Sequence, residues 1–349
     1  MRKFILILMG GLFLLFGCDD DKSDDTSNNL NNINNANNIN NVNNANNTNN
    51  INNTNNTNNA SGVYQSSVSS WLEGELEVEA FEIPDTEAPV LLRVFSPTVS
   101  GNYAVVVFQH GFLMSSGYYS QMLTYLAGHG FVVVAPQMYE AGGLPLGKPS
   151  TEEEKNLALE VRTWIIGNLE QHVQGTPDFD YLGYAGHSRG GKVAWMMLKE
   201  DSSLADAIAG VDPVDGTGGP LGGEERVIGG PFNFPFPSYV LGTGLGPTGM
   251  QACAPDGDNH EQFYEASASP AYHVTATEYG HNDMLDDNLE GCGMECTSCA
   301  SGPEPLLMRE LVQAHLVAFF RGTLQGDSSV FSVLADENSA PVTIETETK

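Results

Sequence analysis

The stretch YLGYAGHSRGGKVAWMMLKE, residues 181–200, decides how this sequence is interpreted. An apolar run ends at Gly186, a serine stands inside Gly-His-Ser-Arg-Gly, and a segment with helical periodicity follows. This pattern is typical of a sharp strand-to-helix turn that exposes a nucleophile, here Ser188. An ordinary polar serine in a glycine-rich connection is the alternative, so the partners elsewhere in the chain decide between the two.

Strand-like and helix-like segments alternate on both sides of this stretch. The apolar runs at 102–109 and 131–136 have the composition of buried strands, and a helical pattern follows each of them. Further strands are expected to end at Asp212 and His281, and a last amphipathic helix to cover 305–320. Such alternation predicts a mostly parallel central sheet with helices on both faces.

The ends of the predicted strands carry reactive side chains. In open α/β sheets, functional groups lie at the carboxyl ends of the strands, which here deliver His110, Ser188, Asp212 and His281 in that order. Serine, acid, histidine is the chain order of the α/β-hydrolase fold, which we therefore predict, with these three as the catalytic residues. Asp215 follows the same strand and is the alternative acid; Asp212 is favoured because it stands at the strand end.

The chemistry of acyl transfer requires these residue types. A serine hydroxyl needs a neighbouring base, and histidine can accept and return a proton near neutral pH. In the predicted elbow, Gly186 and Gly190 leave room for a strained turn, and His187 points away from the nucleophile. The oxyanion hole needs two backbone N–H donors, for which Arg189 and Phe112 are the candidates.

Apolar residues near these positions suggest where an ester would bind. Phe112, Leu113, Met114 and Tyr118, with the Pro/Phe cluster at 231–236, are candidates for an acyl or alcohol pocket, and ordinary core packing is the alternative. No metal or other cofactor is expected. An acidic stretch around residues 256–261 lacks the full ligand pattern of an EF-hand.

The N-terminus has the features of an export signal. Arg2 and Lys3 precede a short apolar run that ends in Leu-Phe-Gly-Cys, so residues 1–17 are interpreted as a lipoprotein signal peptide and Cys18 as the lipidated residue. An ordinary signal peptide is the alternative. The expected location is the bacterial cell envelope, lipid-anchored, on the periplasmic or outer surface.

An asparagine-rich repeat of period three follows, and it cannot bury enough apolar surface to fold. Residues 18–61 are therefore predicted to be a disordered tether. A catalytic domain is expected over 62–335, and a flexible tail over 336–349.

The remaining cysteines and the net charge limit the partners further. Exported chains with an even number of cysteines usually form disulfides, and three pairings are possible among Cys253, Cys292, Cys296 and Cys299, with a metal site as the alternative. The chain has 44 acidic and 14 basic residues, a net charge of −30. This charge argues against nucleic acid and anionic lipid surfaces as partners, and it says little about the substrate. The expected partners are a small-molecule or lipid ester as substrate and a membrane, through the lipid anchor at Cys18.

Several blocks beyond the elbow resemble one known family. They are FQHGFLMSSGYYSQMLTYLAGHGFVVVAPQMY, GHSRGGK, GVDPVDG, CAPDGDNHEQFYE and YGHNDMLDD, in this order between about residues 105 and 321. Together they resemble the chlorophyllases of the α/β-hydrolase superfamily. The resemblance implies a serine carboxylic-ester hydrolase without metal, with Ser188, Asp212 or Asp215, and His281 as the triad.

The signal peptide and the tether are features that plant chlorophyllases lack, so the resemblance does not specify the chlorophyll pigment as substrate. The expected substrate class is an apolar or long-chain ester. A secreted lipase, a polyester hydrolase or an enzyme similar to platelet-activating-factor acetylhydrolase is the alternative within enzymes. A non-catalytic cell-surface binding protein is the alternative of another class.

Overall fold

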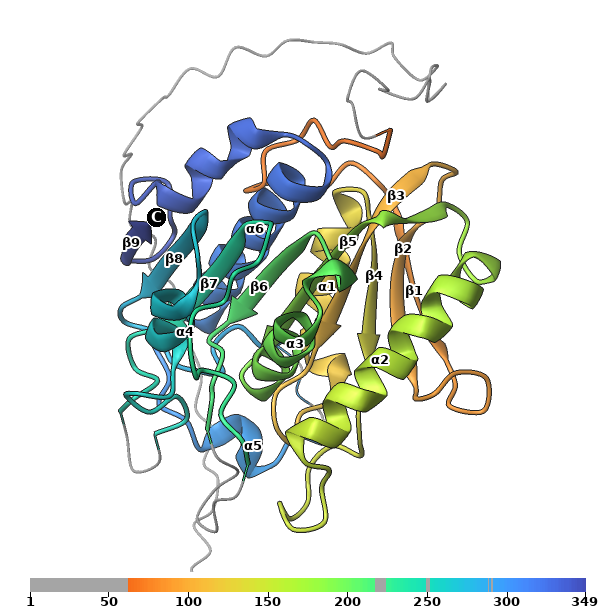
Figure 1. Cartoon of the computed structure of the whole chain (residues 1–349). Helices are drawn as coiled ribbons and strands as arrows, with labels where there is room; N and C mark the ends of the chain where they lie inside the picture. Colours follow the sequence, from red (N-terminus) through yellow and green to blue (C-terminus); the bar gives the residue numbers. More distant parts are fainter. Residues whose placement is uncertain (1–61, 217–223, 249–251, 288, 290) are drawn as a thin grey trace, which may run out of the picture. The chain divides into compact units, whose positions relative to one another are not determined.

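A nine-stranded sheet forms the centre of the computed structural model, which describes residues 62–216, 224–248, 252–287, 289 and 291–349 (Figure 1). The strand order is β1-β2-β4-β3-β5-β6-β7-β8-β9, and the pairs from β4 to β8 are parallel. The strands are β1 (Val78–Ile83), β2 (Leu92–Pro97), β3 (Asn102–Gln109), β4 (Phe131–Pro136), β5 (Thr176–His187), β6 (Ala207–Val211), β7 (Ser238–Thr243), β8 (Ala271–Ala276) and β9 (Ile344–Thr348).

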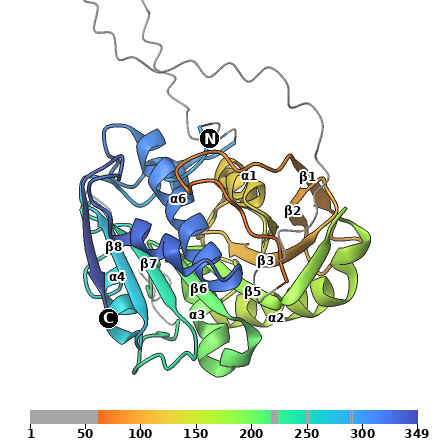
Figure 2. The ribbon, with the colours of Figure 1, turned by 90° about the horizontal axis from the view of Figure 1, so that it is seen from above.

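Helices cover both faces of this sheet, as Figure 2 shows from above. Helices α1 and α6 pack on one face, and α2, α3 and α4 on the other. The α-helices are α1 (Ser120–Gly128), α2 (Thr151–Asn168), α3 (Arg189–Glu200), α4 (His260–Ala266), α5 (Met294–Thr297) and α6 (Pro305–Leu324). This arrangement confirms the predicted α/β-hydrolase fold.

The two hydrophobic cores follow from the alternation of side chains along buried strands. In β3, Val106 and Phe108 point to the core under α1 and α6, whereas Val105 and Val107 point to the core under α2 and α3. A parallel strand is buried on both faces, so β3 and β4 are apolar almost throughout rather than alternating. The sheet thereby becomes a rigid base for the loops at the carboxyl ends of its strands.

The C-terminal residues correct one expectation. The flexible tail predicted over 336–349 contains β9, which pairs antiparallel with β8 from Tyr272↔Thr348 to Ala276↔Ile344. Val342 and Ile344 are buried in the core below α6, and this burial orders the segment. The catalytic domain therefore continues beyond residue 335.

The predicted signal peptide, Cys18 and the tether lie outside the described residues. Among the residues that the structure does describe, no helix is both long enough and apolar enough to span a membrane.

Candidate active site

The turn between β5 and α3 holds Ser188 in a strained conformation, with φ 54° and ψ −123°. Both flanking glycines are required by close packing. A Cβ on Gly186 would lie 2.5 Å from the carbonyl carbon of Gly190, and one on Gly190 would lie 2.3 Å from the backbone oxygen of Gln109. The sequence pattern of the elbow thus has a steric basis: the strand and the helix touch through bare backbone.

Strain of this kind occurs at three non-glycine residues of the described chain, which are Leu113, Ser188 and Asp212, with φ of 62°, 54° and 43°. Each follows a strand of the parallel part of the sheet, after β3, β5 and β6. Positive φ in residues with a Cβ costs about 1–3 kcal/mol and concentrates at functional sites. The backbone alone therefore marks these three loops as one candidate site.

Asp212 and His281 form a buried hydrogen-bonded pair. The His281 Nδ1 lies 2.6 Å from the Asp212 Oδ2, and Thr243 donates to the same carboxylate from its backbone N–H at 3.2 Å and from its hydroxyl at 2.7 Å. Burial opposes the charged carboxylate, but the hydrogen bonds from His281 and Thr243 outweigh it and lower the pKa of Asp212 below its ordinary value. Because Nδ1 donates to Asp212, the other ring nitrogen of His281 is left to accept a proton.

Asp215, the alternative acid, has a different set of partners. Its carboxylate accepts hydrogen bonds from the backbone N–H groups of Val227 at 2.8 Å and Ile228 at 3.0 Å. The Lys192 Nζ lies 3.3 Å from the same carboxylate. Asp215 is thereby committed to holding the segment after β6, whereas Asp212 is the acid that the structure brings to His281.

His187 joins the elbow to the turn that carries His281. The His187 Nε2 lies 2.8 Å from the backbone carbonyl oxygen of His281, and the two rings are 4.5 Å apart. A carbonyl only accepts, so this nitrogen carries the proton, and Nδ1 accepts from the Tyr119 hydroxyl at 2.9 Å. Burial, then the nearby His281, lower the pKa of His187 to about 3, which keeps its ring neutral. This link is a feature that the sequence reasoning missed.

Ser188 and His281 are both nearly buried, 8% and 4% exposed. The Ser188 hydroxyl makes no hydrogen bond to any described residue, so the expected contact between Ser188 and His281 is not formed here. Such contacts are often long in the absence of substrate and tighten when it binds. The hydrogen bond from His187 joins the residue before Ser188 to the backbone of His281.

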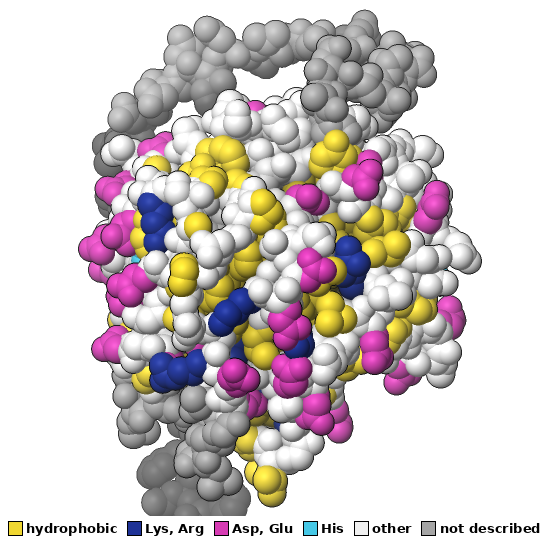
Figure 3. Space-filling view, in the orientation of Figure 1, with side chains coloured by type: hydrophobic (Ala, Val, Ile, Leu, Met, Phe, Trp, Pro, Cys, Tyr) yellow, Lys and Arg dark blue, Asp and Glu magenta, His cyan; other side chains and the backbone are white. Residues whose placement is uncertain are grey.

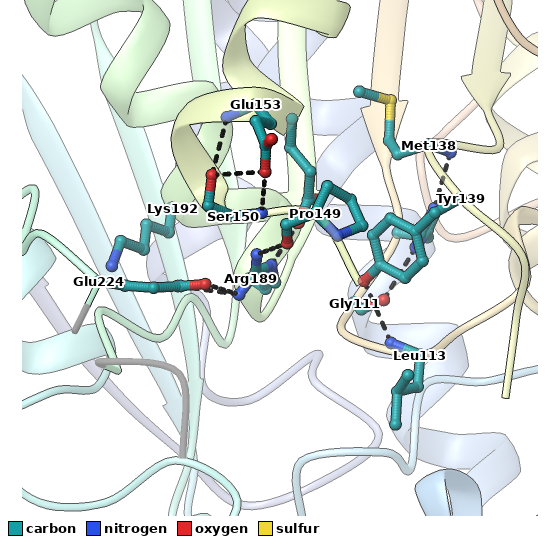
Figure 4. A network of polar contacts seen from close by, with 12 residues as sticks. Gly111, Leu113, Met138, Tyr139, Pro149, Ser150, Glu153, Arg189, Lys192 and Glu224 are labelled. Atoms are coloured by element: carbon teal, nitrogen blue, oxygen red, sulfur yellow. Dashed lines mark hydrogen bonds and ion pairs between the residues drawn. The ribbon is translucent and has the colours of Figure 1, made fainter. Parts of the chain in front are cut away.

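The oxyanion candidates Phe112 and Arg189 have free backbone N–H groups. Tyrosine hydroxyls accept from the N–H groups on both sides of Phe112: Tyr119 from Gly111 at 3.0 Å and Tyr139 from Leu113 at 3.2 Å (Figure 4). Neither the Phe112 N–H nor the Arg189 N–H, at the first position of α3, has an acceptor among the described residues. Two free donors beside a helix N-terminus suit a developing negative charge.

The His110 ring forms hydrogen bonds that join the loop at Gly111 to the segment after β4. The His110 Nε2 accepts from the backbone N–H of Met138 at 3.0 Å, so Nδ1 carries the proton and donates to the Gly111 carbonyl at 2.8 Å. Burial lowers the pKa of His110 to about 4, and the ring stays neutral. It therefore forms hydrogen bonds to the backbone at Gly111 and Met138.

The cysteines are paired as Cys253–Cys299 and Cys292–Cys296, which is one of the connectivities that the sequence left open. The loop that they cross-link holds the turn after β8. Asn282 donates to the Glu295 carbonyl at 2.8 Å, and Asp283 accepts from the Gly302 N–H at 2.6 Å. Within the described part of the chain, no cluster of His, Cys, Asp and Glu is arranged for a metal ion.

Most residues of the predicted apolar pocket belong to the two hydrophobic cores. Phe232, Phe234 and Phe236 stack on one another, with ring centres 5.7 and 5.2 Å apart, and belong to the core under α3 and α4. Met114 and Tyr118 belong to the opposite core. The cluster at 231–236 is thus ordinary packing, because stacked rings buried under helices are not available to a ligand.

We call residues 111–113, which include the candidate donor Phe112, the oxyanion loop. Three exposed apolar side chains near this loop, Leu144, Leu146 and Met294, are defined here as the apolar rim. Their side chains are 78%, 85% and 77% exposed, the highest values among the large hydrophobic residues that the structure describes. The loop at 141–147 is joined to the site by a hydrogen bond from the Gly142 N–H to the Leu113 carbonyl, 2.7 Å long. Helix α5 lies at the lower end of the molecule in Figure 1, and hydrophobic side chains are exposed at this end in Figure 3, which has the same orientation.

Comparisons with known proteins identify the family of this chain. The chlorophyllase family profile matches residues 60–349. Chlorophyllase-2 of Arabidopsis thaliana is 35% identical over 274 residues, which cover 74% of this chain and 85% of that protein. Chlorophyllase-1 of Arabidopsis thaliana is 34% identical, with 76% and 86% covered. The chloroplastic chlorophyllase-1 of Citrus unshiu is 33% identical, with 81% and 87% covered.

Proposed function

This chain belongs to the chlorophyllase family and is a carboxylic-ester hydrolase of the α/β-hydrolase type, and we propose that it works through an acyl-enzyme formed on Ser188. The observation that carries this proposal is the buried Asp212–His281 pair, 2.6 Å between Oδ2 and Nδ1, beside a serine on a strained elbow. A protein that only binds esters has no use for this combination.

In the acylation step, the Ser188 Oγ attacks the carbonyl carbon of the ester while the His281 Nε2 takes the hydroxyl proton. The negative charge on the former carbonyl oxygen is held by the backbone N–H groups of Phe112 and Arg189. The bond between the acyl carbon and the alcohol oxygen then breaks, and His281 returns its proton to that oxygen. Asp212 stabilises the imidazolium between these two transfers.

In the deacylation step, a water molecule attacks the acyl carbon as His281 takes one of its protons. The bond from the acyl carbon to the Ser188 Oγ breaks, and the proton returns to the serine. The products are a carboxylic acid and an alcohol, and the enzyme is regenerated with neutral His281 and charged Asp212.

For the substrate class, we propose an apolar or long-chain ester. The relatives are named for chlorophyll, and only the apolar character of such a molecule is extended to this chain. The apolar rim supports this class, because exposed leucines beside a site mouth gain free energy when they enter an apolar phase. The net charge of −30 favours an uncharged or zwitterionic surface over an anionic one.

For location, we propose a lipid anchor at Cys18 on the bacterial cell envelope, with residues 18–61 as the tether. The described chain enters the domain at the end opposite α5 (Figure 1). Globomycin-sensitive processing and mass analysis of the mature N-terminus test this part independently of catalysis.

Covalent labelling and ester hydrolysis test the proposed function. Purified protein is treated with a fluorophosphonate probe and assayed on short and long p-nitrophenyl esters, beside Ser188→Ala. We expect labelling and turnover in the wild type and neither in the variant. Absence of both labelling and ester hydrolysis in the two proteins would favour a binding protein instead. Selectivity between long soluble esters and solid polyesters separates the lipase and polyester-hydrolase alternatives.

A further inference from the structure

The side chain of Arg189, the residue after the elbow serine, is buried and bonded on every side. Its Nη1 donates to both carboxylate oxygens of Glu224, at 2.7 and 2.9 Å, and its Nη2 donates to the Pro149 carbonyl at 2.6 Å (Figure 4). Its Nε is hydrogen-bonded to Glu154 in the first turn of α2. A single guanidinium thus connects the elbow, the start of α2 and the segment after β6.

The same guanidinium lies against the oxyanion loop. Its central carbon is 5.0 Å from the centre of the Phe112 ring, a cation–π contact. The ring centre of Tyr139 is 6.4 Å from that of Phe112, and the Tyr139 hydroxyl accepts from the Leu113 N–H. The Phe112 side chain is therefore in contact with both Arg189 and Tyr139.

Arginine is the residue that this position requires. Its planar guanidinium fork donates from Nε, Nη1 and Nη2 to three different residues and keeps its face free for an aromatic ring, which a lysine ammonium cannot do. Glu154 and Arg189 are 1% and 8% exposed, so neither charge would be tolerated there without the other. The orientation of the fork is consequently fixed by its partners.

We propose that Arg189 is a positioning residue of the oxyanion hole. Its backbone supplies one donor, and its side chain, fixed by Glu154 and Glu224, sets the Phe112 N–H at the right distance from that donor. This inference rests on the proposed esterase function and deepens it. It assigns a role in transition-state stabilisation to a side chain that touches neither the ester nor the reacting atoms.

Lys192 provides a matched control in the same helix. It is also buried, 1% exposed, and it pairs with a buried acid, Asp215, and with the Gly216 carbonyl at 3.1 Å. Within the described chain it makes no hydrogen bond, ion pair or cation–π contact with Phe112 or the two residues beside it. Lys192→Met therefore reproduces the loss of a buried cation and its effect on stability, without the loss of the contact to Phe112.

The test compares Arg189→Met with Lys192→Met, measured on the fraction of molecules that thermal melting shows to be folded. For Arg189→Met we expect kcat to fall by about 10- to 100-fold with KM changed little. The reason is that a misplaced N–H donor stabilises the transition state less, while binding of the substrate in its ground state is unchanged. An alkyl boronic acid, which forms a tetrahedral adduct on the serine, should bind more weakly by the same factor. Lys192→Met should lower only the melting temperature.

A second set of variants applies if Arg189→Met does not fold. Glu224→Gln weakens the fork, and Phe112→Leu removes the ring while all ion pairs remain. We expect each single variant to lower kcat. The double variant Glu224→Gln/Phe112→Leu should have the same kcat as Phe112→Leu alone, because Glu224 acts on Phe112 through Arg189. Additive losses, or a normal kcat and boronate affinity in folded Arg189→Met, would overturn the proposal. A wild type that neither reacts with the fluorophosphonate nor hydrolyses esters would instead contradict the proposed function.

Discussion

His187 holds the backbone of His281: its Nε2–H donates to the His281 carbonyl oxygen across 2.8 Å. The residue before the nucleophile thus fixes the residue proposed as the base, although their chain positions are 94 apart. The Tyr119 hydroxyl continues this link from His187 to the Gly111 N–H in the oxyanion loop. Elbow, base and oxyanion loop are consequently parts of one hydrogen-bonded unit.

This unit predicts the effect of His187→Phe. The ring volume is kept, but the donor to the His281 carbonyl is lost, so the base is no longer held at its position. We expect kcat to fall by up to about 100-fold, the effect of a displacement on the order of 1 Å. Tyr119→Phe, which leaves the His187–His281 bond intact, should have a smaller effect. Unchanged turnover in folded His187→Phe would show that the base is positioned by other contacts.

The identity of the acid is tested by a pair of variants. Asp212→Asn should reduce kcat by about 10⁴-fold with the fold retained, because the asparagine amide cannot hold the required imidazole tautomer. Asp215→Asn should keep kcat within a few-fold and lower the melting temperature, because Val227, Ile228 and Lys192 lose a charged partner. Steady-state kinetics with thermal melts distinguish the two. A nearly inactive Asp215→Asn beside an active Asp212→Asn would reverse the assignment.

The apolar rim predicts a difference between dissolved and aggregated esters. Leu144→Ser with Leu146→Ser should leave hydrolysis of a short soluble ester unchanged. On a micellar long-chain ester it should lower the rate at least about tenfold, because two exposed leucines no longer enter the apolar phase. Ile166→Ser, at a side chain that is 43% exposed near the C-terminal end of α2, is the control. Equal losses on both esters would place the leucines outside substrate recognition.

Buried neutral histidines predict loss of stability in acid. Burial lowers the pKa of His315 to about 3, and burial with the nearby His281 lowers that of His187 to about 3. In the unfolded chain histidines bind protons near pH 6.5, so between about pH 6.5 and 3 protonation favours unfolding, and stability falls as the pH falls. Each such histidine costs about 2 kcal/mol at pH 5.

Urea unfolding of the wild type and His315→Gln at pH 7 and pH 5 measures this effect. His315 lies in α6, and its Nδ1 is 2.9 Å from the Tyr239 hydroxyl, so the variant also loses some stability at both pH values. The difference between pH 7 and pH 5 should nevertheless be smaller by about 2 kcal/mol in the variant. Parallel curves for the two proteins would show that His315 is not neutral in the folded state.

The sequence was sufficient to predict the main features of this molecule because they are encoded locally. Buried strands appear as apolar runs, and Ser188, Asp212 and His281 stand where those runs end or shortly after. The parallel sheet then brings together whatever follows its strands. The order of the reactive residues, and with it the fold, was therefore accessible from the chain alone.

Features that depend on distant contacts were not accessible. Asp212 and Asp215 follow the same strand three positions apart, and only packing decides which carboxylate meets His281. The carboxylates that fix the side chain of Arg189 are each 35 positions away, one before it and one after. Four of the five residues in the strand Ile344–Thr348 are charged or polar, so it is recognisable only once the edge of β8 is known.

The most direct test of the account is to trap the intermediate on the enzyme. The wild type is mixed with a long-chain p-nitrophenyl ester, quenched in acid within milliseconds, and its intact mass and peptides are measured. We predict a population heavier by one acyl group, with the acyl group on the peptide that contains Ser188, and the same species accumulating further when deacylation is slow. Ester cleavage without any acylated protein, or an acyl group on another residue, would contradict the proposed mechanism.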